Sequence, residues 1–305
     1  MTFPSGIFAV DKPAGMTSHT VISVLRRLTG VHRIGHAGTL DPMATGVLPV
    51  CIGRATRAAD YVADAPKQYI ARLHLGVETD TEDTTGTVIA TSDLRPSVGE
   101  VEAALQGFVG NILQTPPMYS AVQKDGARLY KLARAGIEVE RTPRPITVYG
   151  IKIVSTDETA GDFDLCIDCS KGTYVRTLCA DIGRKLGCGG VMSALRRTRC
   201  GGFSVEEAHT LDELRAMSEA GTLDLAVRST EIAFMDLPSL EINEEGMLRL
   251  KRGAPVYASQ RLGPDIEGVF RIRCGDEFLG IGQICDGLLR CDKGFFETRG
   301  EGEDQ

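Results

Sequence analysis

The sequence lacks any apolar run long enough to cross a membrane. No stretch of its 305 residues approaches the roughly 18 uninterrupted apolar residues that a membrane helix needs. Residues 1–30 carry a Lys-Pro pair and several polar residues where a secretory signal would need an apolar stretch. We therefore expect the protein to stay in the cytoplasm.

A disulfide framework is also missing. The nine cysteines are odd in number and are scattered between residues 51 and 291 without the spacing of a small disulfide-rich scaffold. We expect most of them to be reduced and buried, in a compartment that keeps thiols free.

Motifs for nucleotides and metals are absent or incomplete. There is no G-x-x-x-x-G-K-[ST] segment, and no G-x-G-x-x-G follows a predicted strand. Cys166 and Cys169 form a C-x-x-C pair, but residues three apart on a strand point to opposite faces. The acidic run at 79–83 resembles a magnesium cluster in composition, although such runs between strands are usually solvated loops. We assign no metal.

Charge is distributed unevenly around a net value of −7. Residues 117–200 hold fourteen Lys and Arg against nine Asp and Glu, whereas residues 201–305 hold eleven against twenty-one. Salt screens charges beyond roughly 8 to 10 Å, so a polyanion meets the local patch rather than the total. The composition therefore permits RNA binding in the middle of the chain.

Length and composition predict about two ordinary globular domains, since domains average roughly 150 residues and 42% of the chain is apolar. Apolar periodicity predicts strands at residues 7–10, 47–52, 67–76, 146–154 and 163–169. Helices are predicted at residues 18–29, 98–108, 128–135, 174–186 and 210–219. Ser18 is the predicted cap of the first helix, and Gly30 its end. The irregular order favours an α+β fold over a doubly wound one.

The last third of the chain changes character twice. Residues 201–247 contain eleven acidic and two basic residues and indicate a solvated helical connector. Residues 248–293 contain short apolar runs that indicate a small β-rich domain. The polar tail, FETRGEGEDQ, is expected to fray.

Two segments could carry chemistry. VHRIGHAGTLDPMATG, residues 31–46, has the glycines and the Asp-Pro pair of a loop that bends several times, and Pro42 biases Asp41 toward an extended conformation. A plain turn role for Asp41 and a polar loop role for His36 are the alternatives. SKGTYVRTL, residues 170–178, forms a basic junction between a strand and a helix, suited to anions or to simple helix capping.

Together these segments resemble the TruB family of tRNA pseudouridine synthases. The ordered matches are DKPAGMTS (11–18), GHAGTLDPMATG (35–46), KQYIARLHLG with TDTEDTTG, QTPPMYSAVQKDGARLYKLARAG (114–136), SKGTYVRTL and ALRRTRCGGF (194–203). The resemblance implies a mixed, mostly antiparallel sheet with flanking helices in a catalytic domain at 1–240. It also implies an RNA-gripping insertion at about 114–145 and a PUA-like domain at 241–305.

The resemblance implies a reaction that converts uridine-55 of the tRNA T loop to pseudouridine without a cofactor. Asp41 matches the catalytic aspartate, acting either as a nucleophile at ribose C1′ or as a base at the adjacent carbon. Arg176 matches the arginine that pairs with this aspartate and keeps it ionised. Tyr69 matches the active-site tyrosine, which can stack on the uracil and help to remove the C5 proton.

The uridine must leave its stack to react, so base flipping is also implied. His36 matches a residue that fills the vacated space, and Leu195 matches an apolar pocket wall. Lys12, Lys171, Arg196 and Arg197 are interpreted as positioning residues or RNA contacts. The expected partner is the folded T arm of tRNA, bound by a monomer.

Two other functions remain open from the sequence. One is a pseudouridine synthase that acts on another RNA. The other is an RNA-binding or tRNA-folding protein without catalysis, which the joint presence of Asp41, Tyr69 and Arg176 disfavours.

Overall fold

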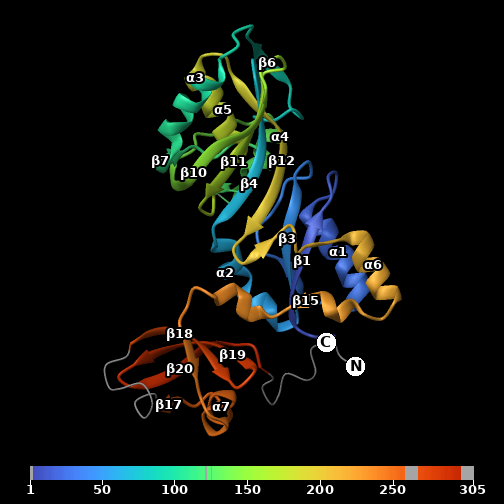
Figure 1. The fold of residues 1–305 in the computed structure, drawn as a ribbon, viewed down its shortest axis with the longest axis vertical. Coiled ribbons are helices and arrows are strands. Elements are labelled where there is room, and N and C mark those ends of the chain that lie inside the picture. Colours follow the sequence, from blue (N-terminus) through green and yellow to red (C-terminus); the bar gives the residue numbers. More distant parts are fainter. Residues whose placement is uncertain (1–2, 121, 125, 258–266, 297–305) are drawn as a thin grey trace. The chain divides into compact units, whose positions relative to one another are not determined.

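A computed structural model describes residues 3–120, 122–124, 126–257 and 267–296 (Figure 1). The chain forms two compact units. Unit 1 comprises residues 1–42, 47–63 and 201–305, and unit 2 comprises residues 43–46 and 64–200. The tail that is expected to fray lies largely at 297–305, outside the described residues.

Unit 2 is built on an antiparallel sheet in the order β12-β4-β11-β10-β7. Its strands are β12 (Gly190–Cys200), β4 (Lys67–Leu75), β11 (Asp162–Cys169), β10 (Arg144–Asp157) and β7 (Gly110–Gln114). The predicted strands at 67–76, 146–154 and 163–169 are confirmed. Alternate residues of β4 are buried, as the sequence pattern indicates for a half-buried strand.

Helices α3 (Val98–Leu105) and α5 (Val175–Leu186) lie against this sheet and each other (Figure 1). Ser97 caps α3 in a capping box with Glu100, and the short helix η2 (Gln106–Phe108) continues it. Gly187 ends α5 in a left-handed conformation, with φ of 75°. Both predicted helices are confirmed.

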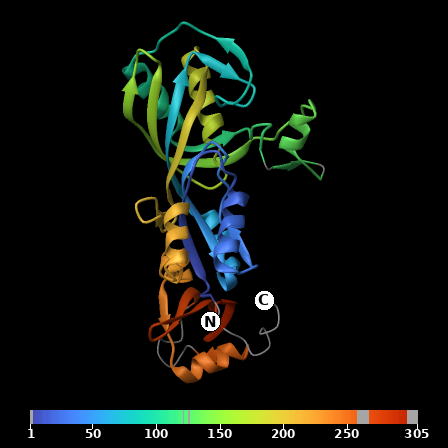
Figure 2. The same ribbon diagram turned by 90° about the vertical axis from the view of Figure 1, so that its right-hand side faces the viewer.

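Two small hairpins extend unit 2. Strands β5 (Val77–Thr79) and β6 (Val88–Thr91) form the first, and β8 (Gln123–Lys124) and β9 (Ala127–Arg128) form the second. The second hairpin continues into α4 (Leu129–Arg134), within the predicted helix at 128–135. Figure 2 shows this insertion projecting away from the sheet of unit 2.

Unit 1 contains a second group of strands. They are β1 (Gly6–Lys12), β2 (Ile34–His36), most of β3 (Thr45–Ile52), β14 (His209–Thr210) and β15 (Val227–Arg228). β14 and β15 pair with β1, and β2 pairs with β3. The prediction that residues 31–46 form only a loop is therefore wrong at 34–36 and also at 45–46, where β3 already begins. Three residues are too few for a pattern, and only pairing with β3 makes them a strand.

Helix α1 (Ser18–Thr29) has the predicted bounds and ends at Gly30, with φ of 71°. The predicted cap is wrong by one residue. Thr17 is the N-cap, because its side chain accepts a hydrogen bond from the Thr20 N–H, and Ser18 is the first helical residue. Residues 53–64 continue from β3 as η1 (Gly53–Ala58) and α2 (Ala59–Asp64).

The acidic segment at 201–247 is not a solvated connector. It supplies β13 (Phe203–Ser204), β14, β15 and β16 (Ser239–Glu241), α6 (Leu211–Glu219), and the short helices η3 (Leu223–Ala226) and η4 (Thr230–Phe234). Leu211, Leu214, Leu223 and Phe234 are buried. The charges occupy its exposed faces, so net composition concealed a segment that contributes to the core.

The β-rich C-terminal domain is confirmed. Its sheet has the order β16-β18-β19-β20-β17, with β18 (Gly268–Cys274), β19 (Glu277–Cys285), β20 (Leu288–Gly294) and β17 (Val256–Tyr257). Helix α7 (Glu244–Lys251) packs on it through Leu250, alongside Ile272, Leu279 and Leu289. This sheet has its own small apolar core.

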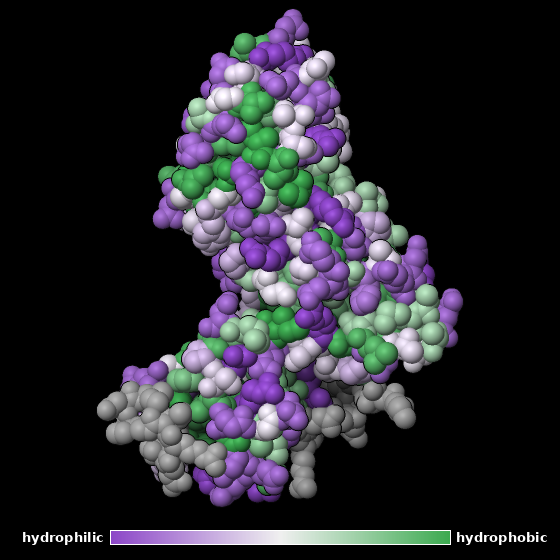
Figure 3. Space-filling model, in the orientation of Figure 1, coloured by the Kyte–Doolittle hydropathy of each residue, from purple (hydrophilic) through white to green (hydrophobic). Residues whose placement is uncertain are grey.

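The surface of unit 2 is not uniformly polar. Figure 3 shows apolar side chains over β7 and β10, strands whose exposed apolar residues include Leu113 and Val154. None of the described helices is long and apolar enough to span a membrane. Six of the nine cysteines are buried, in agreement with the expectation from their scattered positions.

Candidate active site

Asp41 lies in unit 1 on the loop that follows β2. Its side chain is partly exposed, while the neighbouring Leu40 is buried. The carbonyl oxygen of Pro42 accepts hydrogen bonds from the Gly15 N–H at 2.8 Å and from the Lys12 ammonium at 3.3 Å. Pro42 further restricts the backbone of Asp41. The carboxylate is thus presented by a loop whose main chain is fixed.

Lys12 itself is completely buried. Its ammonium also donates to the carbonyl oxygens of Met16 at 2.7 Å and Pro13 at 2.9 Å. A buried ammonium cannot reach an RNA phosphate in this conformation. The structure therefore favours the positioning role over the phosphate contact. Composition gives no sign of this burial, because Lys is a surface residue in most proteins.

His36 ends β2, where it pairs with Val50 of β3, and is half-buried. As a strand residue paired with β3, His36 has a more rigid backbone than a residue in a polar loop would have. Its expected role in the RNA loop stays a prediction.

Tyr69 lies on β4 in unit 2, directly opposite Arg197 of β12 in the antiparallel register. Both side chains are buried, with 8% and 1% of their surface exposed. Burial raises the pKa of the Tyr69 phenol to about 12, although the charge of Arg197 and a hydrogen bond from it oppose the shift. The phenol is therefore neutral at ordinary pH.

The burial of Arg197 argues against its expected RNA contact. Two residues before Tyr69 on the same face of β4 is Lys67, which is 6% exposed, pairs with Cys169 and Cys200 on the neighbouring strands, and feels the charge of Arg197. Burial lowers the pKa of the Lys67 ammonium below its ordinary value. Arg197 thus belongs to a buried polar group around Tyr69 rather than to a phosphate-binding surface.

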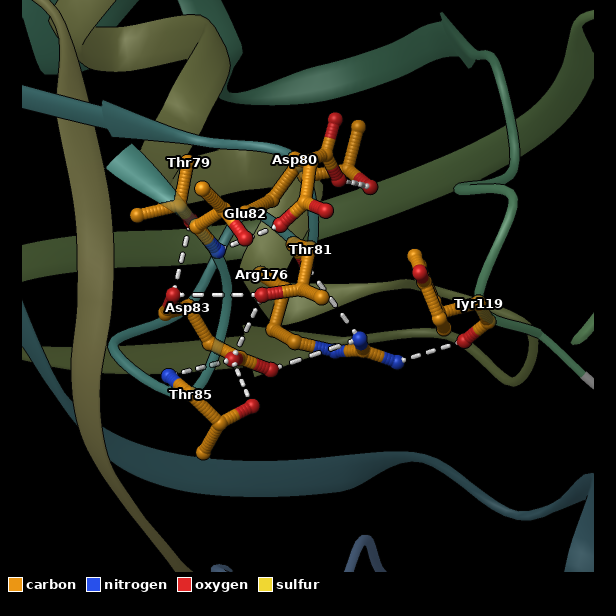
Figure 4. Close-up of polar contacts among 10 residues, drawn as sticks. Thr79, Asp80, Thr81, Glu82, Asp83, Thr85, Tyr119 and Arg176 are labelled. Atoms are coloured by element: carbon orange, nitrogen blue, oxygen red, sulfur yellow. Dashed lines mark hydrogen bonds and ion pairs between the residues drawn. The ribbon is translucent and has the colours of Figure 1, made fainter. Parts of the chain in front are cut away.

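Arg176 is the second residue of α5 and is almost completely buried. Its guanidinium pairs with the Asp83 carboxylate at 3.4 Å and donates to the carbonyl oxygens of Thr81 at 3.3 Å and Tyr119 at 2.9 Å (Figure 4). The expected pairing of Arg176 with Asp41 stays a prediction. The observed partners join the acidic loop, the insertion and α5 within unit 2.

Sequence reasoning missed Asp83, because it interpreted the acidic run as a solvated loop. Asp83 is 4% exposed and accepts from the Thr85 N–H at 2.9 Å, the Thr85 hydroxyl at 2.5 Å and the Thr81 hydroxyl at 2.8 Å. Threonines on both sides of one aspartate were the available signal, since a buried carboxylate needs several donors.

Leu195 and Arg196 follow one another on β12. Leu195 is half-buried, and its carbonyl oxygen accepts from the Thr45 hydroxyl at 3.5 Å. The same hydroxyl accepts from the Arg196 guanidinium at 3.4 Å. These contacts hold the end of the GHAGTLDPMATG segment against β12, which also pairs with Thr45 and Gly46 as a parallel neighbour.

Lys171 lies in the turn before α5 and is exposed. Its ammonium contacts the Asp64 carboxylate at 2.7 Å, with more than half of each side chain exposed. An ion pair between two exposed side chains is weak. An anion can therefore reach the Lys171 ammonium and compete with Asp64 for it.

A separate cavity of about 530 Å³ lies in unit 2. The acidic loop, the insertion and α5 line it, through residues that include Glu82, Tyr119 and Arg184. None of the residues selected from the sequence lines this cavity. Among the described residues, no group of three or more His, Cys, Asp or Glu is placed to hold a metal ion.

Comparison with known proteins gives consistent matches. The profile of the TruB family pseudouridylate synthase (N terminal domain) matches residues 26–175, and that of the tRNA pseudouridylate synthase B C-terminal domain matches residues 176–234. A profile for the C-terminal part of pseudouridine synthase II TruB matches residues 238–293.

Curated relatives are similar over most of the chain. tRNA pseudouridine synthase B of Syntrophotalea carbinolica is 47% identical over 259 residues, which cover 83% of this chain and 82% of the relative. The protein of the same name from Saccharophagus degradans is 41% identical, with 92% of each chain covered.

Among solved structures, a chain of a Cbf5-Nop10-Gar1 complex has a TM-score of 0.74 and 27% identity. The match covers 98% of this chain and 86% of that chain. The predicted mixed α+β fold is thereby confirmed. By profile, identity and fold, the chain belongs to the TruB family of pseudouridine synthases.

Proposed function

We propose that this protein converts uridine-55 in the T loop of tRNA to pseudouridine. The observation that carries the proposal is the extent of its likeness to proteins named tRNA pseudouridine synthase B, at 41% to 47% identity over most of the chain. The reaction breaks the bond between ribose C1′ and uracil N1 and joins C1′ to C5, while C5 loses its proton and N1 gains one. Nothing is oxidised and no group is transferred from outside, so the proposed reaction uses no cofactor.

Asp41 is the catalytic group in this proposal. Its carboxylate either attacks ribose C1′ or removes a proton from the adjacent ribose carbon. Both roles need a carboxylate held in one direction, and the fixed carbonyl of Pro42 on its C-terminal side supports this requirement.

Arg176 and Tyr69 complete the catalytic set. Arg176 stabilises the ionised form of Asp41, and Asp83 limits the orientations that the guanidinium can take. Tyr69 stacks on the flipped uracil. Its raised pKa favours this stacking role over a role as a general base, because a neutral phenol accepts protons poorly.

The partner is the T arm of tRNA. The target uridine is flipped out of its stack, His36 occupies the space it leaves, and Leu195 forms an apolar wall of the base pocket. Lys171 and Arg196 contact RNA phosphates, and the insertion at about 114–145 grips the arm. The enzyme acts in the cytoplasm as a monomer, with residues 241–305 as an additional RNA-binding domain.

The decisive experiment incubates the protein with an unmodified T-arm hairpin, without metal or nucleotide, and maps pseudouridine by position. We expect modification at the uridine equivalent to position 55 alone. A protein that binds the hairpin but never modifies it would instead be an RNA-binding protein, and modification only of another RNA would identify a different substrate.

The Asp41→Asn variant tests the catalytic residue. We expect conversion to fall by at least about a thousandfold, because the amide is neither a nucleophile nor a base, while hairpin affinity changes little. Single-turnover assays and a binding titration measure the two effects separately. Near-normal conversion by the variant would show that Asp41 is not the catalytic group.

A further inference from the structure

Ser18 makes a buried contact with the loop that carries Asp41. Its hydroxyl donates to the Leu40 carbonyl oxygen at 3.1 Å and accepts from the Leu40 N–H at 2.9 Å. Ser18 and Leu40 are each 3% exposed. One hydroxyl therefore satisfies both main-chain polar groups of the residue that immediately precedes Asp41.

This contact is not part of helix capping. Thr17 caps α1 with its own hydroxyl, which accepts from the Thr20 N–H at 3.0 Å. The Ser18 hydroxyl is directed to a residue 22 positions away along the chain. Buried main-chain groups need hydrogen-bond partners. Leu40 lies outside β2, and the Ser18 hydroxyl provides the two hydrogen bonds that a neighbouring strand would provide within a sheet.

The same segment also fixes the other side of Asp41. Pro42 follows Asp41, and its carbonyl oxygen accepts from Gly15 and Lys12. Ser18 therefore holds the main chain before the carboxylate, and Lys12 and Gly15 hold it after. With both neighbours fixed, the backbone of Asp41 cannot rotate without breaking hydrogen bonds to Ser18, Gly15 or Lys12.

We propose that the Ser18 hydroxyl is a positioning group for Asp41, setting the direction from which its carboxylate meets the ribose. The proposal rests on the proposed function, in which Asp41 is catalytic. Misplacement of a reacting group by about 1 Å can cost about a hundredfold in rate. Ser18 therefore acts on kcat through the loop and has no contact with RNA of its own.

The test compares Ser18→Ala with Thr17→Ala on the unmodified T-arm hairpin. We expect Ser18→Ala to lower kcat between about tenfold and a hundredfold, with the hairpin Kd within about twofold of wild type. Thr17→Ala removes the cap of the same helix without touching Leu40. We expect it to lower the melting temperature but leave kcat within about twofold.

Conservative variants separate the effect of the Ser18 hydroxyl group from the effect of the side-chain volume. Ser18→Thr keeps the hydroxyl and should retain at least about half of the wild-type kcat. Ser18→Cys keeps the size but has only a weak hydrogen-bonding group, so it should behave like Ser18→Ala. Ser18→Cys also carries the test should Ser18→Ala fail to fold.

Two results would overturn the proposal. One is a wild-type kcat in Ser18→Ala or Ser18→Cys. The other is a loss of kcat in both the Ser18 and the Thr17 variants that is proportional to the drop in melting temperature of each variant. In either case, pseudouridine formation by the wild-type enzyme and its loss in Asp41→Asn would leave the proposed function intact.

Discussion

At the scale of single residues, burial decides what a polar side chain can do. Tyr69 and Arg197 face each other across two strands with almost no exposed surface, so the phenol keeps its proton and the guanidinium stays away from phosphates. The sequence identifies both residue types but not this pairing. Their roles follow from the register of β4 and β12.

The burial of Tyr69 changes the pH at which its phenol loses a proton. Its folded pKa is about 12, above the ordinary value of 10, so the neutral phenol stabilises the folded state below about pH 10. This contribution is lost as the pH rises from about 10 to about 12. We expect phenolate absorbance to show the ionisation of Tyr69 near pH 12, coinciding with alkaline unfolding.

Tyr69→Phe is the control for that assignment. The late step should disappear from the phenolate titration. Persistence of the step in the variant would assign it to another tyrosine.

The buried ion pair between Asp83 and Arg176 predicts that a single substitution at Asp83 lowers the stability of the protein substantially. Asp83→Asn leaves the buried guanidinium without its counter-charge, and breaking such a pair costs about 3 kcal/mol or more. We expect that loss in the free energy of unfolding, measured by urea denaturation. Conversion of the hairpin should fall at least about tenfold, because Arg176 loses its fixed orientation.

Asp80→Asn is the matched control, in the same acidic loop but exposed. Asp80 accepts a hydrogen bond from the Thr87 N–H at 2.7 Å, and an amide oxygen can replace that acceptor. The change should cost less than about 1 kcal/mol. Equal effects of the two substitutions would contradict a specific role for Asp83.

At the scale of elements, the start of β3 depends on one glycine. Gly46 has φ of 101°, and a Cβ there would overlap the main chain of Arg197, to which it is paired. We expect Gly46→Ala to lower the free energy of unfolding by about 3 kcal/mol or more, from backbone strain and displacement of β12. Urea denaturation measures this loss.

Gly35 lies in the same motif and provides the comparison. A Cβ at Gly35 would meet nothing within 4 Å, and its φ is not in the left-handed region. Gly35→Ala should leave stability unchanged or raise it by up to about 1 kcal/mol. A loss as large as that of Gly46→Ala would show that the motif tolerates no side chain at either position.

Most longer elements were predictable because their signals are local. The bounds of α1, and strands β4 and β11, follow from apolar periodicity and helix-ending glycine. The strands that the sequence did not predict are those that depend on pairing between residues far apart in the chain. β2 and β14 are two or three residues long and are strands only because β3 and β1 lie beside them.

At the scale of the whole molecule, net charge and local charge have opposite meanings. The chain carries a charge of −7, yet we expect RNA affinity to fall with salt because the exposed Lys and Arg residues within 117–200, here called the basic surface, would bind phosphates. If about four phosphates are neutralised, affinity should fall about a hundredfold between roughly 50 and 200 mM salt. Binding titrations at several salt concentrations measure the slope.

Lys171→Gln refines that measurement. Losing one phosphate contact should reduce the slope of log affinity against log salt by about one. Arg215→Gln, at an exposed position of α6 and outside the basic region, should leave the slope unchanged. Affinity independent of salt in the wild type would rule out the basic surface as the RNA-binding face.

The sequence by itself determined the α+β class, the longer helices and strands, and the identity of the candidate catalytic aspartate, since these follow from short-range patterns and an unusual ordered set of motifs. Only the tertiary structure decided which charged residues are buried and with what partners, as with Lys12, Asp83 and Arg197. It also revealed that Ser18 supports Leu40 rather than capping α1. The physical reason is that burial and hydrogen-bond partners are properties of segments brought together from distant parts of the chain, and no local pattern contains them.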